Sequence, residues 1–167
     1  MRPASILDVG CGEGIVTQRI AAVAGVTTVG VDSGDETLRA EWDRREGGLL
    51  SFDAASAYAL PYDDATFECV CALEVLEHLE RPSDALSEMA RVAGRFMLVS
   101  VPREPHWRAA HLFAGRDVRA LGNTSGHVNH WSARAFRRLV SEYGSVSRFE
   151  RPFPWSLAVV ELEPPRG

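Results

Sequence analysis

The sequence predicts an α/β protein with a doubly wound, mostly parallel seven-stranded sheet and an antiparallel edge strand. Short apolar runs alternate with segments of helical periodicity from residue 5 onward, which is typical of a parallel sheet covered on both faces. Two further apolar runs close the chain with no helix between them, which predicts an antiparallel pair. The length of 167 residues suits one domain, so residues 1–167 are predicted to form a single unit.

Seven runs predict the strands. Each is short, rich in apolar or β-branched residues, and followed by turn-forming residues. The five expected in the parallel part of the sheet span residues 5–9, 26–31, 48–52, 67–73 and 95–101, and the closing pair spans 146–150 and 155–163.

Three amphipathic segments predict helices over residues 14–24, 83–93 and 132–143. Each has a glycine where the helix is expected to end, and Ser132 is a plausible N-cap for the third. The residues that share an apolar face are Val16, Ile20 and Val23 in the first, Leu86, Met89, Ala90 and Ala93 in the second, and Phe136, Leu139, Val140 and Tyr143 in the third; the expected stops are Gly25, Gly94 and Gly144.

Composition and charge exclude several classes of protein. The net charge is −5, and all 18 basic residues are arginines with no basic tract, which argues against a nucleic-acid partner. No apolar run reaches the roughly 18–20 residues that span a bilayer, so no membrane segment is expected. No secretory signal opens the chain, which predicts a cytoplasmic protein.

The cysteines are expected to be reduced and structural. Their number is odd, and no secretory signal accompanies them. Cys69 and Cys71 lie two residues apart in an apolar run, so they should face the same side of one strand as small buried side chains. A zinc site would need further ligands that no second cysteine or histidine pair supplies.

The stretch "ILDVGCGEG" (residues 6–14) predicts a glycine loop that lets a ligand approach the backbone. A phosphate-binding P-loop requires a lysine, which the chain lacks, and the dinucleotide fingerprint requires a third glycine where Ile15 stands. Asp8, just before the loop, would repel a pyrophosphate and attract a cation. Asp32 ends the next strand about 20 residues on, where an acid can bind a ribose diol. A ligand with a ribose, a positive charge and no phosphate is indicated, and S-adenosylmethionine fits.

Four stretches in order resemble the motifs of class I S-adenosylmethionine-dependent methyltransferases, closest to the small-molecule branch that includes the ubiquinone and menaquinone methyltransferases. They are "ILDVGCGEG", "VGVDSG", "DAASAYALPYDDATFECVCALEVLEHLERP" and "LVSVPREP", and the resemblance resumes in "GHVNHWSARAFRRLVSEYG". It implies a Rossmann-like fold that binds S-adenosyl-L-methionine, leaves S-adenosyl-L-homocysteine as product and methylates a small-molecule acceptor.

The same resemblance implies the cofactor-binding residues. The loop glycines would admit the methionine part of the cofactor, with Asp8 near its ammonium group. Asp32 would accept both ribose hydroxyls, and Asp53 the adenine amine, although Asp53 could instead cap a turn. The full set of expected cofactor contacts is Asp8, Gly10, Cys11, Gly12, Gly14, Asp32, Ser33, Asp53, Ala54, Leu73, Glu74 and His78.

Histidines are the candidate bases, since imidazole titrates near neutral pH and a hydroxyl acceptor must lose a proton. We rank His127 first, then His78, then His130. Structural roles compete with catalysis: His78 could fix a loop, and one of the other two could cap a helix. His127 and His130 as a metal pair would lack a third ligand, so no metal is predicted.

Residues 103–131 lack periodicity, and a long irregular segment at this sheet edge is expected to bind the acceptor or to act as a lid. Its aromatic residues could stack on the acceptor, or pack on the sheet instead, and its arginines could hold an acidic group. The aromatics are Trp107, Phe113 and Trp131, and the arginines are Arg103, Arg108, Arg116 and Arg119; His106 and His111 lie in the same segment.

Relatives of this branch carry helices before the glycine-loop strand, whereas here that strand begins at residue 5, so the N-terminal helices are expected to be missing. The acceptor pocket would then be open, covered by residues 103–131, or completed by a second copy or a partner subunit. Methylation at oxygen is favoured because no NPPY-type amine or amide clamp is present. A module that binds the cofactor but is non-catalytic or partner-dependent is the alternative, and a nicotinamide dehydrogenase or a nucleic-acid methyltransferase is disfavoured.

Overall fold

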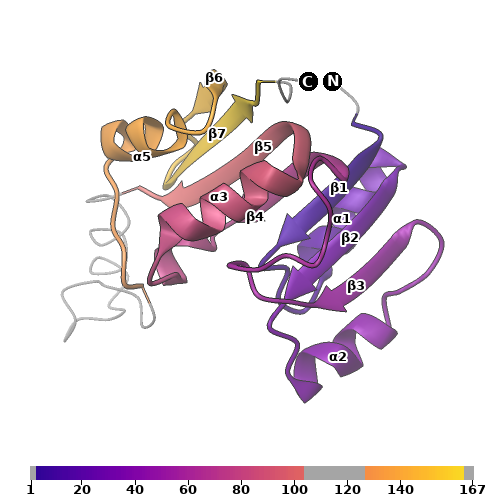
Figure 1. Ribbon diagram of the computed structural model, residues 1–167. Helices are drawn as coiled ribbons and strands as arrows, with labels where there is room; N and C mark the ends of the chain where they lie inside the picture. The colour runs from indigo at the N-terminus through magenta and orange to yellow at the C-terminus, as the bar shows by residue number, and fades with distance from the viewer. Residues whose placement is uncertain (1–2, 104–126, 164–167) are drawn as a thin grey trace, which may run out of the picture.

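The computed structural model describes residues 3–103 and 127–163, and these residues contain one seven-stranded sheet (Figure 1). The strand order is β3-β2-β1-β4-β5-β7-β6. The predicted fold class is confirmed, with β7 antiparallel to both of its neighbours. The strands are β1 (Ser5–Val9), β2 (Thr27–Asp32), β3 (Leu50–Ala54), β4 (Phe67–Leu73), β5 (Ala93–Pro102), β6 (Ser145–Glu150) and β7 (Trp155–Glu161).

Helices cover both faces of the sheet. α3 lies in front of β4 and β5 in Figure 1, and α1 lies behind β1 and β2. This arrangement follows from right-handed crossovers that leave the sheet centre in opposite directions. The described helices are α1 (Ile15–Ala24), α2 (Glu36–Asp43), the 3₁₀ turn η1 (Leu76–His78), α3 (Pro82–Val92) and α5 (Ala133–Val140).

The strand order reverses between β1 and β4, which pair in parallel at the centre of the sheet. Ligands of open α/β sheets bind beyond the carboxyl ends of the strands at this kind of switch point. The fold alone therefore indicates where a site should lie.

The core fills the space between the sheet and its front helices. Leu7, Val70 and Met97 come from the three central strands and are fully buried. Leu86 and Met89 cover them from α3, as the predicted apolar face requires. Phe136 of α5 belongs to the same cluster, so one continuous core positions all of these elements.

The prediction that the apolar face with Val16 and Val23 packs α1 on the sheet is wrong. Val16 and Val23 are 51% and 78% exposed, whereas Thr17 is buried. The Thr17 hydroxyl donates a 2.6 Å hydrogen bond to Asp8 Oδ2 on β1, and this bond holds the Thr17 side of α1 against the sheet. Burying an unpaired carboxylate would cost more free energy than exposing two valines.

Several element boundaries differ from the predicted ones. The strand predicted over residues 48–52 lies two residues later, at Leu50–Ala54. α5 is capped by Ser132 as predicted but ends at Val140, before the expected stop at Gly144. α2 was not predicted because it is short and polar, and it begins where Asp35 caps the Leu38 backbone amide.

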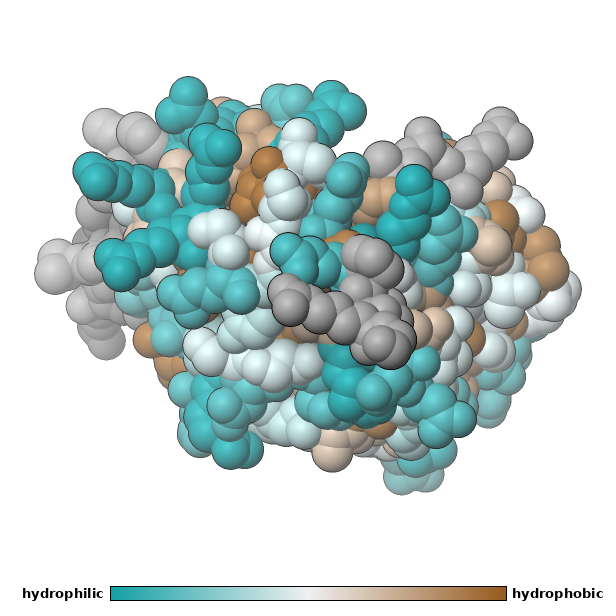
Figure 2. All heavy atoms as spheres, turned by 45° about the horizontal axis from the view of Figure 1, so that its top comes forward, coloured by the Kyte–Doolittle hydropathy of each residue, from teal (hydrophilic) through white to brown (hydrophobic). Residues whose placement is uncertain are grey.

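No helix among the described residues is long and apolar enough to cross a membrane. On the face shown in Figure 2, most side chains are hydrophilic and the hydrophobic ones form small separate groups.

The carboxyl group of Asp8 has a raised pKa because it is buried in this fold. Its side chain is 3% exposed. Burial raises its pKa to about 6, and the nearby charge of Asp32 adds to the rise, while the Thr17 hydrogen bond opposes both. Between pH ~4 and ~6 the native state holds this proton and the unfolded state does not, so the free energy of unfolding falls as the pH rises.

We therefore expect Asp8→Asn to stabilise the chain at neutral pH by about 2–3 kcal/mol, and to have little effect near pH ~3, below both pKa values, where the carboxyl group is mostly protonated in both states. Urea unfolding at the two pH values measures the difference. Asp43→Asn is the matched control, because Asp43 is exposed at the end of α2. An equal effect of Asp8→Asn at both pH values would contradict the raised pKa.

Candidate functional site

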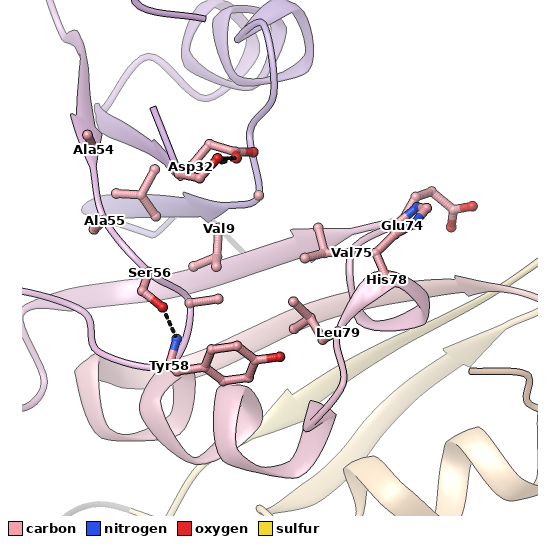
Figure 3. A pocket seen from close by; sticks show the side chains of 14 residues that line it. Val9, Asp32, Ala54, Ala55, Ser56, Tyr58, Glu74, Val75, His78 and Leu79 are labelled. Carbon is pink, nitrogen blue, oxygen red and sulfur yellow. Dashed lines mark hydrogen bonds between the residues drawn. The ribbon is translucent and has the colours of Figure 1, made fainter. Parts of the chain in front are cut away.

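A cavity of about 650 Å³ opens beyond the carboxyl ends of β1, β2, β3 and β4 (Figure 3). Its volume lies in the range of small-molecule and cofactor sites. Its walls come from the glycine loop, the turn after β2, the loop after β3 and the segment around η1. The described lining residues are Val9, Gly10, Val31, Asp32, Ser33, Ala54, Ala55, Ser56, Ala57, Tyr58, Glu74, Val75, His78 and Leu79.

The peptide groups of Gly12, in the glycine loop between β1 and α1, are held from both sides. The Gly12 amide donates to Asp32 Oδ2 at 2.9 Å, and the Gly12 carbonyl accepts from the indole Nε1 of Trp42 at 2.8 Å. Trp42 is fixed in turn by stacking on Phe52, with ring centroids 5.6 Å apart. Trp42 was not among the predicted site residues, because α2 itself was not predicted.

The three loop glycines serve different purposes. A Cβ added at Gly10 would lie 2.4 Å from a Val75 methyl group, and one at Gly14 would lie 2.5 Å from the Phe52 ring. A Cβ at Gly12 would meet nothing within 4 Å. Gly12 therefore faces open space, whereas Gly10 and Gly14 let the loop pack closely on its neighbours.

Asp32 projects from the end of β2 into the cavity wall (Figure 3). Besides Gly12, its carboxylate accepts from the Ser33 amide at 2.7 Å and from the Ser33 hydroxyl at 3.2 Å. An ionised carboxylate offers about four lone-pair sites, so acceptor capacity remains for a ligand hydroxyl.

Asp53 lies outside the cavity lining, whereas its neighbour Ala54 is part of it. The Asp53 carboxylate accepts a 2.7 Å hydrogen bond from the Tyr62 hydroxyl. Burial and this bond to Asp53 raise the pKa of Tyr62 above its usual range. The loop after β3 instead presents Ser56 and Tyr58 to the cavity, and nothing in their spacing had singled them out.

Glu74 adopts a left-handed backbone conformation, with φ of 59°, directly after β4. Its carboxylate accepts hydrogen bonds from the Ser100 hydroxyl at 3.0 Å and from the Trp155 indole at 2.8 Å. Burial raises its pKa, although both hydrogen bonds oppose the rise. A non-glycine residue in this conformation is uncommon and clusters at functional sites.

The other predicted cofactor contacts lie behind the lining. Asp8 is buried under the loop and bonded to Thr17. Cys11 donates its amide to the Val31 carbonyl at 3.0 Å, and burial raises the pKa of its thiol to about 12. Leu73 is the last residue of β4 and pairs with Ser100.

The charges of the cavity favour a cationic ligand over an anionic one. Asp32 and Glu74 are the acidic residues of the described lining, and no arginine is among them. A pyrophosphate would meet two carboxylates and no counter-charge. The apolar wall of Val9, Val31 and Leu79 can cover a flat ring.

The histidines ranked as bases gather on one side of the cavity. The rings of His78 and His127 lie 4.8 Å apart, centroid to centroid, and those of His127 and His130 lie 6.4 Å apart. They meet because residues 127–130 dock on η1: the Val128 and Asn129 amides both donate to the Glu77 carbonyl, at 2.8 and 3.1 Å.

Glu77 is a further ionisable residue beside the histidines, and it was not among the predicted site residues. It is 1% exposed, and burial raises its pKa to about 8; its own nearby backbone amide opposes the rise, and the charge of Glu74 adds to it. Neither carboxylate oxygen has a hydrogen-bond partner. The η1 turn that carries it was not predicted, which explains the omission.

Residues 104–126 of the segment predicted to bind the acceptor lie outside the described residues. The predicted residues that fall in this range are Trp107, Phe113, Arg108, Arg116, Arg119, His106 and His111. Its two ends are described. Arg103 pairs with Trp131 in a parallel bridge, and the Arg103 Nε is buried with no hydrogen-bond partner.

A family model described as a methyltransferase domain matches residues 1–146. This match confirms the resemblance of the sequence to class I S-adenosylmethionine-dependent methyltransferases, and the doubly wound sheet agrees with it. The chain belongs to the methyltransferase-domain family.

Curated relatives carry related names. The 27-O-demethylrifamycin SV methyltransferase of Amycolatopsis mediterranei is 33% identical over 95% of this chain and 62% of its own length. The ubiquinone biosynthesis O-methyltransferase of Pseudomonas fluorescens is 33% identical over 65% of this chain and 48% of its own. The norajmaline N-methyltransferase of Rauvolfia serpentina is 34% identical over 55% of this chain and 33% of its own. The chain thus spans a third to two thirds of these relatives.

Solved structures share the fold. A chain from Haloferax volcanii in complex with the Trm112 methyltransferase activator gives a TM-score of 0.78 at 18% identity, over 98% of this chain and 83% of that one. The magnesium protoporphyrin IX methyltransferase of Synechocystis with bound S-adenosylhomocysteine gives 0.67 at 18% identity, over 95% and 74%.

The glycine geometry predicts unequal costs for two small substitutions. Both Gly10 and Gly12 have positive φ, which disfavours alanine by about 1–2 kcal/mol. Only Gly10→Ala adds a clash with Val75, worth about 1–3 kcal/mol more. Thermal or urea unfolding should show Gly10→Ala as the more destabilising variant, and equal losses would contradict this loop conformation.

Proposed function

We propose that this chain binds S-adenosylmethionine in the cavity beyond β1–β4 and transfers its methyl group to a small-molecule acceptor, with oxygen as the favoured acceptor atom. The observation that carries the proposal is the charge of the cavity, which has two carboxylates and no arginine in its described lining. The cofactor supplies an electrophilic methyl group on a sulfonium. Its positive charge and lack of phosphate match this lining.

The residues fit the cofactor as follows. Asp32 has lone pairs left for ribose hydroxyls, and the open side of Gly12 admits a ligand against the backbone. Ala54 and the loop that follows it supply an apolar edge for adenine, with the free oxygen of Asp53 as the proposed acceptor for the adenine amine. Glu74 lies on the side proposed for the methionine end. Of the remaining predicted contacts, Gly10, Ser33 and His78 line the cavity and are proposed to contact the cofactor directly, whereas Asp8, Cys11, Gly14 and Leu73 lie next to the described lining and are proposed to complete the site.

The acceptor is proposed to enter beside His78, His127 and His130. A hydroxyl acceptor must lose its proton, and a neutral imidazole at the cavity edge can take it. The order of candidates for this base stays His127, His78 and His130. Alignment of the acceptor and exclusion of water contribute to the rate with any acceptor atom.

A partner-dependent module is the second candidate function. The likeness to a chain solved with the Trm112 methyltransferase activator supports it. A homodimer that completes the acceptor pocket is the related possibility. In both cases the cavity would bind the cofactor, and the chain alone would not turn over.

Titration of S-adenosylhomocysteine into the purified chain tests the cofactor site. We expect a micromolar dissociation constant and a loss of about 10–100-fold in Asp32→Asn, because charged hydrogen bonds to the ribose contribute about 1.5–3 kcal/mol. Asp43→Asn is the matched control and should bind like the unmodified chain. NADH, whose pyrophosphate would face two carboxylates, should bind at least about 100-fold more weakly. Equal affinity for NADH would overturn the proposed cofactor.

Turnover is tested separately by measuring S-adenosylhomocysteine release against a panel of phenols, alcohols, amines and carboxylates. Oxygen acceptors are expected to react, with His127→Ala slowing turnover by about 10²–10⁴-fold if it is the base. Cofactor binding without turnover on any acceptor would favour the partner-dependent module.

A further inference from the structure

Three metal-ligand side chains converge beside the cavity. Glu77 and His78 come from η1, and His127 comes from the segment that docks on η1 some 50 residues later in the chain. One ligand atom from each lies within 4.8 Å of the other two. Backbone hydrogen bonds help to hold them there, since the Glu77 carbonyl accepts from both the Val128 and the Asn129 amides.

The buried carboxylate of Glu77 has no hydrogen-bond partner among the described residues. The residue is 1% exposed, and neither Oε1 nor Oε2 has a hydrogen bond. Buried carboxylates are normally paired, hydrogen-bonded or bound to a metal, because an isolated one loses its hydration without compensation. Asn129 is close by but uses its side-chain amide on the Leu79 carbonyl, at 2.5 Å.

We propose that Glu77, His78 and His127 bind one divalent transition-metal ion of the Zn²⁺ type beside the cavity. Two imidazole nitrogens and one carboxylate oxygen form a donor set that such ions prefer and that Ca²⁺ and Mg²⁺ do not. Three protein ligands leave a coordination position open, as at catalytic rather than structural zinc sites. His78 also lines the cavity, so the open position would be reachable from it.

With an ion bound here, the order of bases proposed above for the metal-free chain no longer applies, whatever the reaction. A ring nitrogen bound to a metal cannot accept a proton, so His127 and His78 would then hold the ion. His130, whose ring lies 6.4 Å from that of His127, would be the described histidine left for proton transfer. The competing arrangement is a metal-free ion pair between Glu77 and a protonated His127.

The test measures metal binding by the whole chain after dialysis against a chelator. Co²⁺ titration followed by visible absorption reports the ligand field, and Zn²⁺ competition against a chromophoric chelator gives the affinity. We expect one ion per chain. Glu77→Gln and His127→Asn should each weaken Zn²⁺ binding by more than about 100-fold, since loss of even an outer-shell partner costs roughly 10–100-fold.

Glu80→Gln is the matched control, because Glu80 is exposed three residues further along and should change the affinity less than about twofold. His78→Asn changes the exposed ligand, so it tests the site even if a variant at a buried ligand does not fold. No stoichiometric binding, or binding that survives all three ligand substitutions, would overturn the proposal. Binding lost only in Cys69→Ser would place the ion at the cysteines and also overturn it. Titration of S-adenosylhomocysteine into the same metal-free samples keeps this outcome separate from the cofactor proposal.

Discussion

The two peptide groups flanking Gly12 form the constraint on which the site depends. A carboxylate from the end of β2 fixes the amide, and an indole from α2 fixes the carbonyl. The loop between β1 and α1 is thereby tied to the end of β2 and to α2. The same carboxylate borders the cavity, so one side chain both shapes the loop and presents charge to a ligand. Loss of that charge would therefore change the affinity and the loop shape together.

The histidine side of the site depends on a second, long-range contact. Residues 127–130 reach η1 through backbone hydrogen bonds to the Glu77 carbonyl and through the Asn129 side chain. These bonds do not depend on which side chains the segment carries at 127 and 130. Two histidines can thus be presented on a fixed backbone, next to a buried carboxylate and at the edge of an acidic cavity. Backbone anchoring of this kind leaves the side chains available for chemistry.

Features set by short-range spacing were predictable from the sequence, and features set by long-range packing were not. The glycine loop and Asp32 were found because a strand, a turn and an acid about 20 residues on form a local pattern. The inward face of α1 was misjudged because periodicity shows which residues share a face but not that a Thr17–Asp8 bond outweighs apolar burial. Trp42 and Glu77 were missed because each acts on residues 30 or more positions away, from a short element with little periodicity.

The position of β7 has a consequence for how the chain folds during synthesis. β5 is complete once residue 102 has been made, yet its second neighbour, β7, begins at residue 155. Until then the β5 edge has unpaired backbone groups, and it exposes residues such as Val99 and Val101 that are buried in the folded chain. An exposed apolar edge is a template for association with other chains. Nascent chains halted between these two points should therefore be the species most prone to aggregate and the most dependent on chaperones.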